Sequence, residues 1–414
     1  MIKFFHTADL HFGVEKYGKI DSKTGMNSRL LDFKKNFEYC IELAIKEKID
    51  FFLFCGDAYK TAFPTPTQQK TLMQLLFKLR QANIPIVAVV GNHDHPLSFG
   101  KANSLDILSE LPIDGFHVFS KPNILKLKTK KGMVQIVGIP WPTRNNLIAT
   151  KEHHFKDSKQ ITSFLSQAVS NIISSFAKKL DPKIPSILAA HLTIGTGIFS
   201  GSEKCAVFGN DPIFLSSQLA INPFDYVALG HLHRYQNLNS KGYPAIVYSG
   251  SIERVDFGER KEKKGFCLVH IDEKKEGERC KFEFIKLNAR PMIQIEVILK
   301  SGEDQTLQIL KEINKHDIKD SILKIVYYVP EGKKDKVDLQ QVQYVCRFAK
   351  NLAEIVPIRK LVKREKRASL TVDMNLETLL EKYFDTKDFS KEKKSSLLKK
   401  AREIYSDFSN KNGD

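Results

Sequence analysis

The sequence has little of what secreted and membrane proteins use. Its 414 residues include only six cysteines, none of them in a C-x-x-C pair, and Cys55 lies in an apolar run. We therefore expect buried free thiols in a reducing compartment. The first ten residues lack the apolar core of a signal peptide, and no apolar stretch approaches the roughly 20 residues that cross a bilayer. These absences predict a cytoplasmic protein without a membrane anchor, nucleoid-associated if the source is prokaryotic.

Acidic residues are also in deficit. The chain has 65 Lys and Arg residues against 48 Asp and Glu residues, which gives a formal net charge of +17. Such an excess favours a polyanionic partner, either nucleic acid or an anionic membrane face. A lysine-rich genome would produce the same composition, so the charge alone leaves the partner open.

Short apolar runs alternate with helical patterns over the first two-thirds of the chain. The runs that predict strands are 2–6, 49–55, 84–90, 134–139, 186–190, 225–230 and 244–249. Helical spacing occupies 28–48, 65–82 and 158–179. This alternation predicts a layered α/β domain whose strands are buried on both faces.

A second pattern begins near Ala289. It predicts a small α+β unit with strands and helices in the order 292–299, 304–315, 322–329, 338–352 and 355–362. The stretch RKLVKREKR that follows is strongly basic and is expected to be exposed. The tail predicts two amphipathic helices, 375–384 and 391–408, with Ser390 as the N-cap of the second. Two helices cannot bury such apolar stripes against each other alone.

Residues with metal-binding side chains follow five of the predicted strands. They stand in the segments TADLHFG, GDAYK, GNHD, AHLT and GHLH. The carboxyl ends of strands are where layered α/β sheets bind ligands. The residues of D-x-H and H-x-H lie two apart, so each pair can face one centre in extended backbone.

Each of these segments alone is a weak signal. An isolated H-x-H is more often a surface pair than a metal site, and G-D after a strand is usually a turn. Five together, in this order, predict a metal site. The donors are oxygen and nitrogen without sulfur, which suits Mn, Fe, Zn or Mg.

The order D-x-H, G-D, G-N-H-D, H, G-H-x-H resembles that of the calcineurin-like metallophosphoesterase superfamily. The segments HTADLHFG, GNHD, ALGHLHRYQ and YSGSIERVDFGE, followed by KGF and NARP, are similar to the SbcD family, the nuclease subunit of the SbcCD double-strand-break repair complex. The resemblance covers about residues 1–290 in motif detail. It implies a layered α-β-β-α metallophosphoesterase domain at 1–288, a smaller α+β DNA-capping domain with a basic linker at 289–370, and a C-terminal helical pair at 371–414.

The resemblance also implies two divalent metal ions, with Mn²⁺ expected. One ion would be held by Asp9, His11, Asp57 and His233. The other would be held by Asp57, Asn92, His191 and His231, so that Asp57 bridges the two.

Further roles follow from the same resemblance. His93 would contact the scissile phosphate or the leaving oxygen, with Asp94 as its orienting partner. Lys60 stands where some family members have a phosphate-binding histidine, so it is a doubtful substrate-binding residue. His95 has no assigned role, and we expect it to be a solvated loop histidine.

The implied function is a DNA nuclease that acts in double-strand-break and hairpin processing. It would digest duplex ends and cut single strands, together with an SbcC-like coiled-coil ATPase bound by the C-terminal helices. Helix 65–82 has an apolar arc wider than one core-facing stripe needs, which fits burial inside its own domain or, by resemblance, a homodimer. Two alternatives remain: a metallophosphodiesterase or phosphatase with a non-DNA substrate, and a metal-free scaffold. All seven candidate ligands are present, which favours catalysis.

Overall fold

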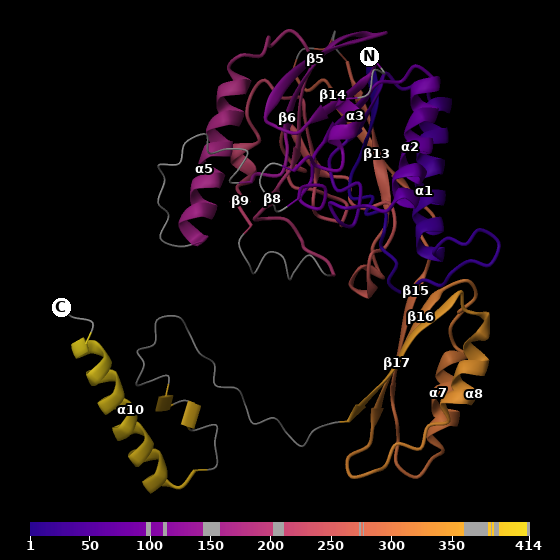
Figure 1. Ribbon diagram of the computed structural model, residues 1–414, viewed down its shortest axis with the longest axis vertical. Coiled ribbons are helices and arrows are strands. Elements are labelled where there is room, and N and C mark those ends of the chain that lie inside the picture. Colours follow the sequence, from indigo (N-terminus) through magenta and orange to yellow (C-terminus); the bar gives the residue numbers. More distant parts are fainter. Residues whose placement is uncertain are drawn as a thin grey trace. The chain divides into compact units, whose positions relative to one another are not determined.

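The chain forms two compact units in the computed structural model, which describes residues 1–96, 101–110, 114–143, 158–201, 211–272, 275, 277–359, 380–381, 383–384 and 389–411 (Figure 1). The first unit comprises residues 1–295, 316–324 and 343–354. The second comprises residues 296–315, 325–342 and 355–414. The domain boundaries that we placed at 288 and 370 stay predictions.

The first unit contains two six-stranded sheets. The strands of the first, in sheet order, are β14 (Cys280–Lys286), β13 (Gly265–Ile271), β1 (Ile2–Thr7), β2 (Phe51–Phe54), β3 (Ile86–Val89) and β4 (Phe116–Phe119). Strands β1 to β4 run parallel, whereas the hairpin β13–β14 pairs antiparallel with β1.

The second sheet follows the same principle, with a parallel centre. Its order is β11 (Gln236–Asn237), β12 (Ala245–Tyr248), β10 (Tyr226–Gly230), β7 (Ser186–His191), β6 (Gly132–Ile139) and β5 (Asn123–Thr129). Strands β12, β10, β7 and β6 are parallel. A separate two-stranded sheet joins β8 (Thr193–Ile194) to β9 (Ile213–Phe214). All seven predicted strands of this unit are confirmed, although β4, β5, β13, β14 and the two-residue strands β8, β9 and β11 were not foreseen.

The two sheets pack face to face between helices, which confirms the predicted α-β-β-α layers. Apolar side chains from β1, β2 and β3 meet those from β6, β7, β10 and β12 in one core between the sheets. A second core lies between the first sheet and the helices α1 (Ser28–Lys46) and α2 (Pro66–Gln81). A third lies between the second sheet and α5 (Ser158–Ala177). A short helix, α3 (Asp106–Glu110), precedes β4.

Helix α2 begins at a capping box. Thr65 and Gln68 each bind the other's backbone, and Pro66 occupies the first turn. The leucines of its inner face are buried, and the half-buried Met73 and Phe77 pack against the same core. Most of the wide apolar arc is thus used within the domain. The homodimer through this helix stays a proposal.

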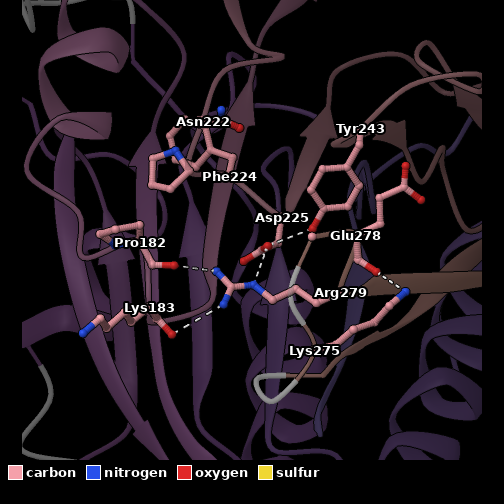
Figure 2. Close-up of a pocket in the computed structure, with 11 residues that line it drawn as sticks. Pro182, Lys183, Asn222, Phe224, Asp225, Tyr243, Lys275, Glu278 and Arg279 are labelled. Carbon is pink, nitrogen blue, oxygen red and sulfur yellow. Dashed lines mark hydrogen bonds and ion pairs between the residues drawn. The ribbon is translucent and has the colours of Figure 1, made fainter.

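An ion pair between the buried Asp225 and the partly buried Arg279 joins the two sheets at the edge where β7 and β10 begin. Asp225 accepts hydrogen bonds from the Arg279 Nε at 2.8 Å, the Tyr243 hydroxyl at 2.8 Å and the Ser186 backbone N–H at 2.8 Å. Arg279, just before β14, also donates to the carbonyl of Pro182 at 3.0 Å (Figure 2). These residues line a surface pocket, and their polar groups bind one another. We therefore assign the pocket a structural role, as a contact between the two sheets.

A three-stranded sheet, in the order β15-β16-β17, follows the hairpin. Its elements along the chain are β15 (Met292–Ile298), α7 (Gln305–Ile313), β16 (Ile322–Val329), α8 (Leu339–Val345) and β17 (Asn351–Arg359). The helix that we predicted over 338–352 is wrong in length, because a strand begins within it. The Asn351 N–H donates to the Ser321 carbonyl and its side chain to the Tyr17 carbonyl. These long-range bonds outweigh the local helical pattern.

The tail ends in helix α10 (Lys391–Lys411), which confirms the helix predicted at 391–408. The Ser390 Oγ accepts a hydrogen bond from the Lys393 N–H at 3.3 Å, as an N-cap does. Most of the other predicted tail helix, and all of the basic stretch beyond Arg359, lie outside the described residues. No described helix is both long and apolar enough to cross a bilayer. Of the six cysteines, the five that the structure describes are free thiols.

Candidate metal centre

The seven predicted ligands all lie where strands end. Asp9 and His11 follow β1, Asp57 follows β2, Asn92 follows β3, His191 ends β7, and His231 and His233 follow β10. Strands β1, β2 and β3 are parallel neighbours in one sheet, and β7 and β10 are parallel neighbours in the other. Their carboxyl ends therefore reach one edge of the sandwich, and the structure brings all seven side chains together there.

Several of these residues have a strained backbone. Asp9, His11, Asp57 and His231 have φ angles of 54°, 45°, 59° and 104°, in a region that L-residues seldom occupy. Each such residue costs about 1–3 kcal/mol. The conformation is held by neighbouring backbone, since the Asp9 N–H donates to the Gly56 carbonyl at 2.9 Å and the His11 N–H to the Asp57 carbonyl at 3.0 Å. Strain concentrated in this way is typical of functional sites.

Glycines permit the close approach of the strand ends. A Cβ on Gly56, whose φ is 91°, would collide with the imidazole of His191. A Cβ on Gly230 would collide with the backbone carbonyl of Cys55. The glycines of the G-D and G-H-x-H segments therefore let the ends of β2 and β10 come together.

Asp9, His11 and His233 form the first group of ligand atoms. These atoms lie within 4.8 Å of one another, and all three residues are buried. The His11 Nε2 and His233 Nε2 are 2.9 Å apart. The His233 Nδ1 lies 2.8 Å from the Glu259 carboxylate, so it carries the proton and leaves the lone pair on Nε2.

The second group contains His191, Asn92 and His231. The His191 Nε2 lies 2.9 Å from the Asn92 Oδ1, which is also 3.2 Å from the His231 Nδ1. The His191 Nδ1 donates to the Cys55 carbonyl at 2.7 Å, and its Nε2 therefore faces the site. Asp57 lies between the groups, because its Oδ2 is 3.4 Å from the His191 Nε2 and 3.7 Å from the His11 Nε2. A carboxylate that bridges two ions must lie between the two groups of ligands, as that of Asp57 does.

Burial and mutual charge perturb the pKa values of the site. Burial raises the pKa of Asp9 to about 7, despite the opposing charge of His233. Burial would also raise the pKa of Asp57, but His191 and His93 hold it well below its usual range. Burial lowers the pKa of His11 well below its usual value and that of His231 to about 3. These two imidazoles are therefore neutral and can act as ligands.

The residues fit divalent cations. The Nε2 atoms of His11 and His233 are 2.9 Å apart, and that of His233 bears a lone pair. Two such nitrogens need a proton or a cation between them. Two buried carboxylates, Asp9 and Asp57, likewise need nearby positive charge. The donors are carboxylate, amide and imidazole, a set suited to Mn²⁺, Zn²⁺ or Fe²⁺. Which ion each residue holds stays a proposal.

His93 lies beside both groups. Its ring centroid is 4.9 Å from that of His11, and its ligand atom belongs to a third close group with His11 and Asp57. Its Nδ1 donates to the backbone carbonyl of Lys60 at 2.9 Å. This bond fixes the ring and leaves Nε2 as the nitrogen available to a substrate.

The predicted role of Asp94 as the orienting partner of His93 is wrong. The fully buried Asp94 carboxylate accepts hydrogen bonds from the backbone N–H groups of Asp57 at 2.8 Å, Gly91 at 3.0 Å and Ala58 at 3.0 Å. It thus ties the loop after β2 to the loop after β3. Burial and the charge of Asp57 raise its pKa to about 6. Asp94 supports the ligand loops, whereas the His93 ring is held by Lys60.

Lys60 contributes to the site through its backbone and its charge. Its carbonyl holds His93, and its N–H donates to the Phe12 carbonyl at 3.0 Å. Its ammonium is close enough to help lower the pKa of His93, after the larger effects of burial, which lowers it, and of Asp57, which raises it. Contact with phosphate stays a prediction. The half-buried His95 binds only its neighbour, the Pro96 carbonyl, among its described partners.

Four further residues surround the ligands and were not foreseen. The Trp141 ring lies 4.9 Å from that of His231, centroid to centroid, and the Asp211 Oδ2 lies 3.7 Å from the His231 Nε2. Glu259 binds His233 and is itself bound by the buried Lys264 at 2.7 Å. Burial would raise the pKa of Glu259, but Lys264 and His233 hold it at about 2. Glu259 lies in the segment SIERVDFGE, and that segment was the feature of the sequence that could have identified it.

Comparisons with known proteins agree with this geometry. The family model for calcineurin-like phosphoesterases matches residues 2–235. The D subunit of the SbcCD nuclease from Staphylococcus epidermidis is 29% identical over 323 residues, 76% of this chain and 77% of the relative. The protein of the same name from Staphylococcus saprophyticus is 28% identical over 317 residues, 76% of each chain.

Two solved structures were also matched at low similarity. The protein TT1561 of Thermus thermophilus is 12% identical, with a TM-score of 0.37, covering 68% of this chain and 98% of its own. A dimetal phosphatase from Danio rerio is 11% identical, with a TM-score of 0.38, covering 65% of this chain and 92% of its own.

Proposed function

Because the chain belongs to the calcineurin-like phosphoesterase family, we propose that it is a two-metal nuclease that hydrolyses phosphodiester bonds in DNA. The observation that carries this proposal is the meeting of seven oxygen and nitrogen ligands at one edge of the sandwich, with Asp57 between the two groups. The names of the Staphylococcus relatives and the net charge of +17 support a nucleic-acid substrate.

The residues divide into two coordination sets that share one carboxylate. Asp9, His11, Asp57 and His233 would hold one ion, and Asp57, Asn92, His191 and His231 the other. Ions bound there, with Mn²⁺ expected, would bind phosphate oxygens and lower the pKa of a bound water to produce the nucleophile.

His93 is the catalytic residue that the geometry favours. Its Nδ1 proton is committed to the Lys60 carbonyl, so Nε2 is the atom that can hold or give up a proton at the substrate. Burial lowers the His93 pKa, whereas the charge of Asp57 raises it. Burial is the larger of the two effects, so the net shift of the pKa is downward, and a phosphate beside the ring would act against it. The protonated ring can then donate to the leaving oxygen, and the Lys60 ammonium adds positive charge for the phosphate.

The finer activities and partners complete the proposal. The chain would digest duplex ends and cut single strands in break and hairpin processing. It would pair as a homodimer through α2, whose Met73 and Phe77 are only half-buried. An SbcC-like coiled-coil ATPase would bind the C-terminal helices, of which α10 is described.

A cleavage assay tests the function directly. Metal-free protein is given Mn²⁺ and offered end-labelled duplex DNA, circular single-stranded DNA, a generic phosphodiester and a phosphoprotein. We expect both DNAs to be cut in Mn²⁺ and neither in EDTA. Hydrolysis of the phosphoprotein with both DNAs intact would contradict the nuclease and favour a phosphatase on the same scaffold. Fewer than one bound transition ion per chain would favour a scaffold.

Two substitutions separate catalysis from metal binding. His93→Ala should retain metal and lower DNA turnover by about 10²–10⁴-fold, the usual share of one acid–base group. Asp57→Ala should lose the metals as well as the activity, because it belongs to both groups. His95→Ala, the neighbouring histidine, is the matched control and should cut at the wild-type rate. Loss of metal from His93→Ala would contradict this division of roles.

A further inference from the structure

A buried ion pair stands directly behind one of the candidate ligands. The Lys264 Nζ lies 2.7 Å from the Glu259 Oε2, and both side chains are fully buried. A lysine and a glutamate are rarely buried at this depth without a specific use, since desolvation of each charge costs several kcal/mol. The candidate ligand that this pair contacts is His233.

The pair holds His233 at two points. The Glu259 Oε1 accepts the Nδ1 proton of the His233 ring at 2.8 Å. The Lys264 Nζ donates to the backbone carbonyl of the same histidine at 3.0 Å. Ring orientation and backbone position are thus fixed by two partners that are bound to each other.

The carboxylate is itself held in place. Its Oε2 accepts the backbone N–H of Val255 at 3.0 Å, in addition to the Lys264 ammonium. Lys264 has a second carboxylate partner, Glu262, at 3.1 Å. Glu259 binds both Lys264 and the His233 ring, whereas Glu262 is the second carboxylate partner of Lys264. Substitution of each glutamate in turn can therefore be compared.

The other imidazole nitrogens that face away from the ion-binding positions lack such support. The His191 Nδ1 donates to a neutral backbone carbonyl, that of Cys55. The His231 Nε2 is 3.7 Å from Asp211, beyond hydrogen-bond distance, and the His11 Nδ1 has no hydrogen-bond partner among the described residues. Within the described part of the chain, only His233 of these four rings has its rear nitrogen bonded to a carboxylate, which makes a histidine a stronger and better-oriented ligand.

We propose that Glu259, anchored by Lys264, is a positioning residue that aims the His233 Nε2 at the ion-binding position and sets the affinity of one metal position. The proposal rests on the proposed metal centre. Removing Glu259 should weaken the position that His233 serves and leave the position served by His191 and His231 nearly unchanged.

Metal titration tests this inference without an activity measurement. Metal-free full-length protein is titrated with Mn²⁺ by calorimetry, and thermal unfolding in EDTA reports on the fold. We expect Glu259→Ala to weaken one of two sites by about 10–100-fold, the usual effect of removing a ligand's orienting partner. Glu259→Gln should lose less, because its amide oxygen can still accept the Nδ1 proton, and it carries the test if the alanine variant does not fold.

The matched control is Glu262→Gln, which makes the same change of charge on the other partner of Lys264. It should alter neither site by more than about threefold, since it leaves the grip on His233 intact. Wild-type binding by both Glu259 variants would overturn the inference, as would an equal loss in Glu262→Gln. A wild-type protein that binds no Mn²⁺ would overturn the metal centre itself, which is a different result.

Discussion

Substitution of Asp94 by alanine tests whether this residue supports the fold or the chemistry. Its carboxylate is fully buried and accepts three backbone N–H groups within 3.0 Å, from Asp57, Gly91 and Ala58. Without it, these N–H groups stay buried and unsatisfied, at about 1–3 kcal/mol each. The expected loss of unfolding free energy is therefore about 3–9 kcal/mol, a large part of the roughly 5–15 kcal/mol that holds a typical protein folded.

Urea denaturation in EDTA, followed by circular dichroism, measures this loss without any contribution from metal. Asp94→Asn keeps one acceptor oxygen and should lose less than Asp94→Ala. His95→Ala is the control and should stay within about 0.5 kcal/mol of wild type, because the one described partner of this half-buried side chain is its own neighbour. If Asp94→Ala were as stable as wild type but slow in turnover, Asp94 would act on the chemistry after all, and the reasoning from its hydrogen bonds would be refuted.

Three further predictions concern other parts of the chain. Burial lowers the pKa of His6 to about 3 from 6.5 in the unfolded chain, so the unfolded state alone binds this proton as the pH falls from 6.5 to 3. Over that range the unfolding free energy of wild type in EDTA should fall more steeply than that of His6→Gln, by about 1.4 kcal/mol per pH unit, and equal slopes would contradict the neutral buried imidazole. Arg279→Met should lower the unfolding free energy by about 3 kcal/mol, because it leaves the buried Asp225 carboxylate without its cation. Lys281→Met is the control at an exposed lysine and should change the unfolding free energy by no more than about 0.5 kcal/mol. Deletion of 371–414 should leave Mn²⁺-dependent DNA cleavage intact and abolish co-purification with a coiled-coil ATPase; retained association would place that contact elsewhere on the chain.

The ligand positions could be predicted from the sequence because each one depends on a local pattern. Buried parallel strands are continuous apolar runs, and the polar residue that ends such a run must lie at the sheet edge. Asp57 after FFLFC and His231 after YVAL are examples. The layered fold follows from the same runs together with the helical spacing between them.

The features of the site and fold that the sequence did not reveal depend on contacts that no local pattern encodes. Asp94 adjoins His93 in sequence, yet along the turn their side chains point to different partners, a carboxylate to backbone N–H groups and a ring to Lys60. Glu259 reaches His233 across 26 positions, and β17 begins at Asn351 because of bonds to distant strands and loops. The strand β14 was missed because strands were sought as continuous apolar runs, whereas its residues from Cys280 to Phe284 alternate apolar and polar side chains.

The position of β1 beside β13 has a consequence for synthesis of the protein on the ribosome. Strand β1 pairs on one side with β13, residues 265–271, and the last of the candidate ligands, His233, precedes that strand. A growing chain therefore carries Asp9 and His11 long before it carries the residues that complete their surroundings. Translation products that stop short of the hairpin lack the strand that β1 pairs with on that side, so we expect them to be unable to cut a phosphodiester.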